Sequence, residues 1–241
     1  MAGWAALWQQ PTKESTASAR DYFERAMKIE PQNAEAMVGL GYARYRTDAY
    51  GWGTAAENSY AAQLELLTKA TAINPGYAFA HYVKSLVFWL AKQYPEAIEA
   101  AQTAVTLDPN AAYGYAAIGQ AEFKLGRCEQ SIEHIKKAFG LSPRDPLGGA
   151  WHMMLGLDEE CLDRRDAAIM EFKRAIDGGY RPFIPYAAGL EAAKGNDAEA
   201  KLALAEARRL NPQLTIKWFL ENPPAPSGVI EGLRKAGLRE E

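Results

Sequence analysis

A short pattern that recurs along most of the chain constrains its fold more than any other feature of the sequence. An alanine precedes a proline at one fixed spacing in the strings AMKIEPQN, ATAINPGY, AVTLDPN, AFGLSPRD and ARRLNPQ. The interval from Pro75 to Pro109 equals the interval from Pro109 to Pro143. The interval from Pro143 to Pro212 is about twice as long, so it leaves room for one further unit. A fixed period of roughly 20 to 50 residues indicates a chain built from stacked, similar units.

Each unit contains the residues of two short helices that pack closely together. A bulky residue followed by glycine occurs in the first half of several units, as in Leu155-Gly156. In the second half, a small residue, a large residue and an alanine follow at helical spacing, as in Ala168, Phe172 and Ala175. Glycine lets two helices approach closely, and the final proline ends the second helix because it has no amide donor. The pattern therefore predicts an all-α fold of short antiparallel helices.

This pattern resembles the tetratricopeptide repeat (TPR), in which a W-x2-L-G-x2-Y motif is followed by A-x3-F and a terminal proline. The resemblance covers residues 1 to about 214. It implies an all-α, right-handed superhelical TPR solenoid of about six helix-turn-helix repeats with a C-terminal capping helix. The expected repeats occupy residues 1–33, 34–77, 78–111, 112–145, 149–182 and 181–214. We expect the solenoid and its cap to span residues 1–222, and a proline-rich link with an amphipathic segment to span residues 223–241.

The second expected repeat is about ten residues longer than a standard repeat, and its surplus lies between its two helices. Tyr50, Trp52 and Tyr60 stand in this surplus, together with two glycines. Aromatic side chains on a surface loop are suited to binding a partner. The same side chains could instead fold onto the first two repeats, so both interpretations stay open.

The last part of the chain contains an apolar segment that needs to be covered. Its aliphatic residues are Val229, Ile230, Leu233 and Leu238. The proline-rich link before them spans at most about 20 Å, so the segment cannot cross to the second and third repeats. We predict that it packs against the helices near residues 183–193 and 215–220 and completes the cap that a solenoid needs.

The first helices of the second, third and fourth repeats are expected to place aromatic side chains on one concave surface. Residues spaced i, i+4 and i+7 share one face of a helix. The aromatic residues at or beside these places are Tyr42, Tyr45, Phe79, Tyr82, Trp89, Tyr113 and Phe123. Aromatic side chains are effective anchors for a partner. We therefore predict a groove that binds an apolar or amphipathic segment of another protein, whose identity the sequence does not name.

Other interpretations of the same residues stay open. The aromatic side chains could be solenoid core, the groove could be filled by the chain's own tail, or it could bind a small ligand as a sensor. TPR domains that clamp a terminal carboxylate resemble each other in placing Lys, Arg and Asn at these positions. The basic residues nearby are Arg44, Arg46, Lys84 and Lys124, and the asparagines are absent. This difference argues against a carboxylate clamp.

The two ends of the chain carry a second resemblance. The segments GWAALWQQPTKESTASARDYFERAMKIEP and GVIEGLRKAGLREE are similar to the TPR region that follows the catalytic domain in bacterial class III adenylate cyclases and related regulators. The cyclase's metal-binding aspartates have no counterpart here. The resemblance implies a regulatory or tethering module, and it makes a small-ligand sensor of a larger signalling protein the alternative function.

Charge and hydrophobicity exclude several classes of partner. The chain has 27 Lys and Arg against 30 Asp and Glu, a net charge of −3 and a pI near 5.8, so it lacks the basic excess that attracts nucleic acid. No stretch approaches the roughly 20 apolar residues that cross a bilayer, and the N-terminus lacks the basic region of a secretory signal. We expect a cytoplasmic protein with no nucleic-acid partner and no membrane insertion.

The residue types that carry chemistry are scattered. His81, His134 and His152 have no partner at metal-ligand spacing, and no phosphate-binding glycine motif is present. Cys128 and Cys161 have no CxxC partner, so we interpret both as reduced, partly buried helix residues. The sequence therefore predicts a non-catalytic module with no cofactor and no metal.

Overall fold

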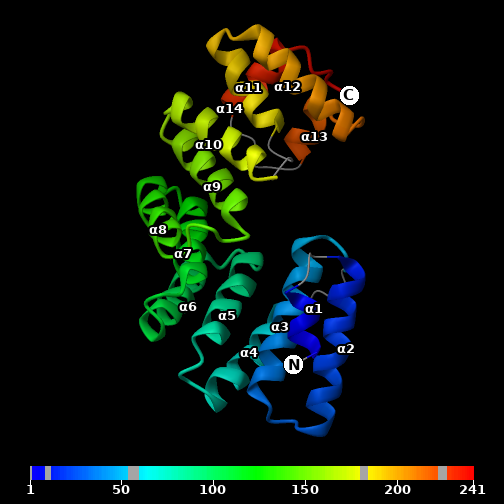
Figure 1. The fold of residues 1–241 in the computed structure, drawn as a ribbon, viewed down its shortest axis with the longest axis vertical. Helices are drawn as coiled ribbons and strands as arrows, with labels where there is room; N and C mark the ends of the chain where they lie inside the picture. The colour runs from blue at the N-terminus through cyan, green and yellow to red at the C-terminus, as the bar shows by residue number, and fades with distance from the viewer. Residues whose placement is uncertain (1, 9–11, 54–59, 180–183, 222–226) are drawn as a thin grey trace. The chain divides into compact units, whose positions relative to one another are not determined.

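The computed structural model of the chain describes residues 2–8, 12–53, 60–179, 184–221 and 227–241. Within these residues the backbone forms helices joined by turns and contains no strand, which confirms the predicted all-α class (Figure 1). Contacts divide the chain into two compact units, Met1–Leu125 and Gly126–Glu241. The boundary between them falls in a turn, so no described helix crosses it.

The described part of the N-terminal unit consists of helices that pack in chain order. They are α1 (Ala2–Leu7), α2 (Lys13–Ile29), α3 (Ala34–Ala49), α4 (Tyr60–Ile73), α5 (Ala78–Leu90), α6 (Tyr94–Leu107) and α7 (Ala112–Lys124). Each helix contacts the next one along the chain. In addition, α3 contacts α5 and α5 contacts α7. The helices α3, α5 and α7 therefore form a continuous row, called here the inner row of the N-terminal unit.

The C-terminal unit follows the same scheme and ends differently. Its described helices are α8 (Cys128–Leu141), α9 (Gly148–Cys161), α10 (Arg165–Asp177), α11 (Ile184–Lys194), α12 (Asp197–Leu210), α13 (Ile216–Glu221) and α14 (Ser227–Lys235). From α8 to α12, each helix contacts the next one. The last helix, α14, turns back and packs along α11 (Figure 1).

Local sequence explains how helices begin and how paired helices turn. At the start of α2, the Ser15 amide donates to Thr12 Oγ1 at 3.0 Å and the Thr12 amide donates to Ser15 Oγ at 3.2 Å, which forms a capping box. The turns that follow α5, α7, α9 and α11 each contain a residue with positive φ. These residues are Lys92, Gly126, Asp163 and Gly195, with φ of 60°, 73°, 56° and 90°. Only the two glycines adopt this conformation without strain.

Glycines at helix contacts bring paired helices close together, as the sequence predicts. A Cβ on Gly156 would lie 2.5 Å from the ring of Phe172, which is fully buried. A Cβ on Gly41 would lie 2.8 Å from a methyl carbon of Leu67, which is also fully buried. Both separations are shorter than carbon–carbon contact, which is about 3.5 Å or more. A larger residue at either glycine would push the helices apart.

The interpretation of Cys128 and Cys161 as reduced residues is wrong, because the two form a disulfide. Their Cα atoms lie 6.5 Å apart although 33 residues separate them in the chain. Cys128 is the first residue of α8 and Cys161 is the last residue of α9. Since consecutive helices run in opposite directions, these two ends meet. The separation is close to one repeat, so a search for CxxC spacing could not find the pair.

The prediction for the end of the chain is confirmed. Val229 and Leu233 of α14 are fully buried, and a Cβ on Gly189 of α11 would lie 2.5 Å from the Val229 carbonyl oxygen. After α14, the Arg239 and Glu240 carbonyls accept hydrogen bonds from the first amides of α13, at 3.0 and 2.9 Å. The final residues therefore tie α13 and α14 together at the end of the unit.

The insertion in the second expected repeat lies partly outside the described residues, because residues 54–59 fall there. In the described part, the rings of Tyr50 and Trp52 stack with 4.7 Å between their centroids. Tyr60 is the first residue of α4. The two interpretations of this loop, a binding loop or a packed extension, both stay predictions.

Candidate functional site

Phe79 on α5 is the centre of a cluster of aromatic rings on the inner row of the N-terminal unit. The centroid of its ring lies 5.7 Å from that of Tyr42, 5.4 Å from that of Tyr82 and 5.5 Å from that of Tyr113. Tyr42 also stacks on Tyr45 with 6.0 Å between centroids. Ring pairs at these separations attract each other. The structure therefore brings five of the seven predicted site residues into one connected cluster.

The other two predicted residues, Trp89 and Phe123, meet at Lys124 of α7. The Lys124 ammonium lies 5.7 Å from the ring centroid of Trp89 and 5.6 Å from that of Phe123. A cation over a ring face is attracted by the ring's quadrupole. Partial burial lowers the pKa of Lys124. The indole N–H of Trp89 is buried and has no hydrogen-bond acceptor among the described residues.

Trp4 and Trp8, which the sequence analysis did not assign to the site, also join the Phe79 cluster. Trp4 on α1 lies 5.5 Å from Phe79 between ring centroids, and Trp8, directly after α1, lies 6.1 Å from it. Trp8 stacks on Trp4 with 5.9 Å between centroids. The two tryptophans are spaced i, i+4, which places them on one helical side. That spacing was the signal that could have added them to the site.

A buried arginine of α3, Arg46, forms a hydrogen bond with the end of α1. The Arg46 Nη1 group donates to the Leu7 carbonyl oxygen at 2.6 Å, and Arg46 is only 4% exposed. This bond holds the end of α1 directly before Trp8. Burial raises the pKa of the neighbouring Tyr42 phenol, and the Arg46 charge opposes this rise. The Tyr42 side chain is therefore a neutral hydroxyl at physiological pH.

Exposure distinguishes the residues that can touch a partner from those that support them. Tyr82 is 8% exposed, so it mainly supports its neighbours. Phe79, Tyr42, Tyr45 and Tyr113 are half-buried. Trp8 is 66% exposed although its ring stacks on Trp4. The outermost contact of the cluster is therefore a residue that lies outside the predicted set.

Models of known protein families match the middle of the chain. One tetratricopeptide-repeat model matches residues 55–112, and a second matches residues 112–145. Residues 55–145 therefore match models of the tetratricopeptide repeat. Among curated proteins, it is similar to the small glutamine-rich tetratricopeptide repeat-containing protein 2 of Saccharomyces cerevisiae, with 26% identity over 86 residues. This match covers 36% of the chain and only 25% of the yeast protein.

Solved structures confirm the TPR solenoid fold. A thermophilic TPR protein from Thermus thermophilus is 25% identical, with a TM-score of 0.58 over 75% of this chain and 92% of that chain. A second similar structure is that of the APC/C hetero-tetramer Cut9–Hcn1. It gives a TM-score of 0.74 at 16% identity, over 93% of this chain and 40% of that chain. At that identity the likeness concerns the fold alone.

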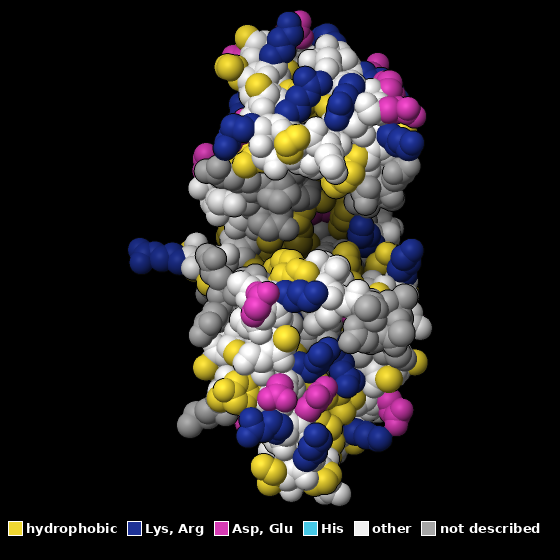
Figure 2. Space-filling view, turned by 90° about the vertical axis from the view of Figure 1, so that its right-hand side faces the viewer, with side chains coloured by type: hydrophobic (Ala, Val, Ile, Leu, Met, Phe, Trp, Pro, Cys, Tyr) yellow, Lys and Arg dark blue, Asp and Glu magenta, His cyan; other side chains and the backbone are white. Residues whose placement is uncertain are grey.

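The described residues offer little for other kinds of chemistry. They contain no group of three or more His, Cys, Asp or Glu side chains that could hold a metal ion. No helix within the described ranges is long and apolar enough to span a membrane. Acidic side chains lie beside basic ones on the face shown in Figure 2. The aromatic cluster is therefore the feature of the structure that best supports a function.

Proposed function

We propose that the N-terminal unit is a non-catalytic interaction module that binds an apolar or amphipathic segment of a partner protein at the Phe79 cluster. TPR folds generally serve as scaffolds for protein–protein interaction. The observation that carries the proposal is Trp8, which is 66% exposed on a support of contacting rings. Large aromatic residues of this kind supply much of the binding energy in protein interfaces.

The surroundings of the cluster indicate the chemistry of the partner segment. The Tyr42 and Tyr113 phenols stay neutral because burial raises the pKa of both, that of Tyr113 to about 12. They can donate hydrogen bonds to backbone carbonyls of a bound segment. Lys124, beside Trp89 and Phe123, supplies a positive charge at the same row. The proposed segment therefore presents apolar anchors to Phe79 and Trp8 and an acidic residue to Lys124.

The test uses helical peptides displayed on phage and selected on the wild-type chain, because the partner is unidentified. Replacing Trp8 with Ala should weaken a selected peptide by roughly 30-fold, which corresponds to about 2 kcal/mol. Titration calorimetry measures this change. The melting temperature should hardly move because most of the Trp8 side chain is in solvent.

Trp218→Ala is the matched control, since Trp218 is also an exposed tryptophan, at 41%, but lies in the C-terminal unit. The proposal requires that this variant bind the peptide as tightly as the wild-type chain. Peptides that bind the Trp8→Ala and wild-type chains equally would place the site elsewhere. The loop at Tyr50 and Trp52 would then be the next surface to test.

A second candidate function is a small-ligand sensor within a larger signalling protein such as an adenylate cyclase. The buried indole N–H of Trp89, which lacks an acceptor among the described residues, supports it. A small ligand with an oxygen acceptor would satisfy this donor and contact Lys124. Native mass spectrometry of the purified chain distinguishes the two functions. A bound compound that also raises the melting temperature would favour the sensor.

The cytoplasmic location stays a prediction, and the disulfide bears directly on it. Disulfides persist mainly in oxidising compartments, and in the cytosol they are usually transient or redox-sensing. In a cytoplasmic chain, the bond between Cys128 and Cys161 is therefore expected to be reversible.

A further inference from the structure

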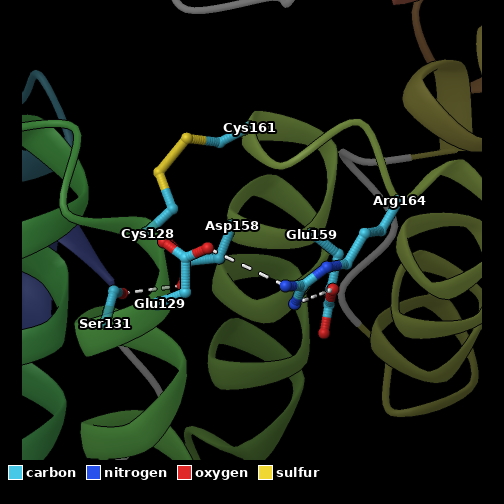
Figure 3. Close-up of a disulfide and its surroundings, with 7 residues drawn as sticks. All are labelled: Cys128, Glu129, Ser131, Asp158, Glu159, Cys161 and Arg164. Carbon is cyan, nitrogen blue, oxygen red and sulfur yellow. Dashed lines mark hydrogen bonds and ion pairs between the residues drawn. A yellow bond between two sulfur atoms is a disulfide. The ribbon is translucent and has the colours of Figure 1, made fainter.

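The disulfide closes the open end of the hairpin formed by α8 and α9. Cys128 begins α8 and Cys161 ends α9, so the bond lies at the opposite end of the hairpin from the connecting turn (Figure 3). The two halves of the bond differ in exposure. Cys128 is fully buried, whereas Cys161 is exposed. A reagent in solution therefore reaches the bond from the Cys161 side.

The contact directly beneath the bond is polar. Ser131 Oγ donates to Asp158 Oδ2 at 2.7 Å, and both residues are fully buried. Ser131 lies three residues after Cys128, and Asp158 lies three residues before Cys161, so the pair is one helical turn inside the bond. Burying a carboxylate costs free energy that hydrogen bonding offsets only in part. The Ser131–Asp158 hydrogen bond itself therefore adds little to the non-covalent stability of the open end.

The contacts outside the bond are ion pairs of Arg164. Arg164 lies 3.8 Å from a Glu129 carboxylate oxygen and 3.4 Å from a Glu159 carboxylate oxygen (Figure 3). The Arg164 and Glu129 side chains are 52% and 66% exposed, and ion pairs this open contribute about 1 kcal/mol or less. By contrast, the turn end of the hairpin is packed by Phe139 against Trp151, with 5.2 Å between centroids. The disulfide is the covalent link between the two helices at the open end.

We propose that the Cys128–Cys161 disulfide is reversibly reduced by thiol–disulfide exchange, and that a low-molecular-weight thiol such as glutathione attaches at Cys161. The thiolate attacks Cys161 Sγ, and a new S–S bond forms there as the Cys128–Cys161 bond breaks. The electron pair leaves on Cys128 Sγ, which takes up a proton. A second thiolate then attacks the attached thiol and releases Cys161, which is also protonated. Overall, one protein disulfide and two thiols become two cysteines and one low-molecular-weight disulfide.

Attack at Cys161 follows from access, because the incoming thiolate must reach the sulfur along the axis of the S–S bond. Reduction then releases only the open end of the hairpin. The first turn of α8 and the last turn of α9 can separate and admit water to Asp158, while Phe139 and Trp151 hold the turn end. This inference does not depend on the proposed binding site in the N-terminal unit.

The test treats the folded wild-type chain, purified without reductant, with reduced glutathione. Acid quenching followed by peptide mapping should find the mixed disulfide on the Cys161 peptide at least tenfold more often than on the Cys128 peptide. Hydrogen exchange should rise near residues 128–134 and 156–162 and stay unchanged near residues 139–151. A mixed disulfide mainly on Cys128, or reduction only after global unfolding, would overturn the proposal. So would two free thiols in the untreated chain.

Single variants test the same asymmetry without a disulfide. Cys128→Ala leaves the exposed cysteine, and oxidised glutathione should modify it at least tenfold faster than it modifies the buried cysteine left by Cys161→Ser. Circular dichroism checks that both variants are folded. Equal rates in two folded variants would show that the exposure of Cys161 does not direct the exchange. If one variant fails to fold, the mapping on the wild-type chain decides alone.

Discussion

The two units use the first helix of a repeat in contrasting ways. In the N-terminal unit, α5 carries Phe79 at the centre of a ring cluster whose outermost member is Trp8. In the C-terminal unit, α11 is covered by α14 of the same chain. The residues at one repeat position differ accordingly. Leu86 precedes Ala104 by the same interval by which Gly189 precedes Ala207, so Leu86 and Gly189 are equivalent. Without a side chain at Gly189, the backbone of α14 can lie directly on α11.

This difference teaches that glycines at a helix contact can decide whether a repeat presents a surface or receives a helix. A Cβ on Gly189 would lie 2.5 Å from the Val229 carbonyl oxygen, and a Cβ on Gly232 would overlap the Gly189 carbonyl. Two glycines therefore face each other across the contact between α11 and α14. This contact covers α11, whereas the proposed partner site lies on the N-terminal unit.

The largest effect is expected from breaking the glycine contact. Gly232→Leu should drive α14 away from α11 and expose Val229, Ile230, Leu233 and Leu238, which are at most 7% exposed in the structure. Each aliphatic side chain is worth about 1.5–3 kcal/mol when buried, and the entropy of ordering α14 offsets part of the sum. We expect the free energy of unfolding to fall by roughly 4 kcal/mol in urea titrations and the chain to self-associate.

Gly228→Ala provides the matched control on the same helix. A Cβ on Gly228 would lie 3.3 Å from a Glu160 carboxylate oxygen, which can move aside. This variant should therefore stay monomeric with a nearly unchanged unfolding midpoint. If Gly232→Leu behaved in the same way, α14 would be a loosely attached segment and the contrast between the two units would fail.

The fold and the packing of the C-terminal tail could be predicted from the sequence because both depend on short-range patterns. The spacing of Ala104, Pro109 and their counterparts specifies paired helices, and four aliphatic residues on one short segment must be buried near the place where the link ends. Neither inference needs knowledge of which distant residues meet. The fold class, the close approach at Gly156 and the packing of α14 on α11 were predictable for this reason.

The parts that were missed depend on contacts between residues far apart in the chain. Cys128 and Cys161 meet only because the ends of α8 and α9 adjoin. Trp4 and Trp8 reach Phe79 although α1 is a short helix in the irregular first repeat, where positions could not be assigned by spacing. Tyr82 was placed on the correct row, but its 8% exposure follows from neighbours on α5 and α7. Periodicity assigns a helical face and not the exposure of a side chain.

A smaller effect concerns alkaline pH and can be compared between the units. Burial raises the pKa of Tyr113 in the N-terminal unit to about 12, and burial does the same for Tyr186 in the C-terminal unit. An unfolded tyrosine has a pKa of about 10, so each neutral phenol contributes stability below that pH and loses it as the pH rises toward about 12. Tyr113→Phe cannot ionise and should lose less stability over this range. Urea titrations at several pH values measure this loss of stability.

Tyr186→Phe should reduce the alkaline loss in the same direction, but through the other unit. The double variant should therefore show the sum of the two effects, because the two tyrosines belong to different compact units. A Tyr113→Phe chain whose stability fell with pH in parallel with the wild-type chain would mean that the Tyr113 phenol ionises as easily in the folded state as in the unfolded state.

The smallest effect concerns strained turns, one in each unit. Lys92 and Asp163 adopt positive φ where Gly126 and Gly195 stand in the equivalent turns. Lys92→Gly should raise the free energy of unfolding by roughly 0.5–1 kcal/mol, because glycine removes the strain and the greater freedom of the unfolded chain offsets only part of the gain.

Asp163→Gly should raise the free energy of unfolding by less, since aspartate tolerates this conformation better and its carboxylate pairs with Arg165 at 3.2 Å. Gly126→Ala isolates the backbone cost, because a Cβ there meets no atom within 4 Å, and it should destabilise the chain by about 1 kcal/mol. A loss of stability on Lys92→Gly together with no loss on Gly126→Ala would show that side-chain contacts, and not backbone strain, determine the stability of these turns.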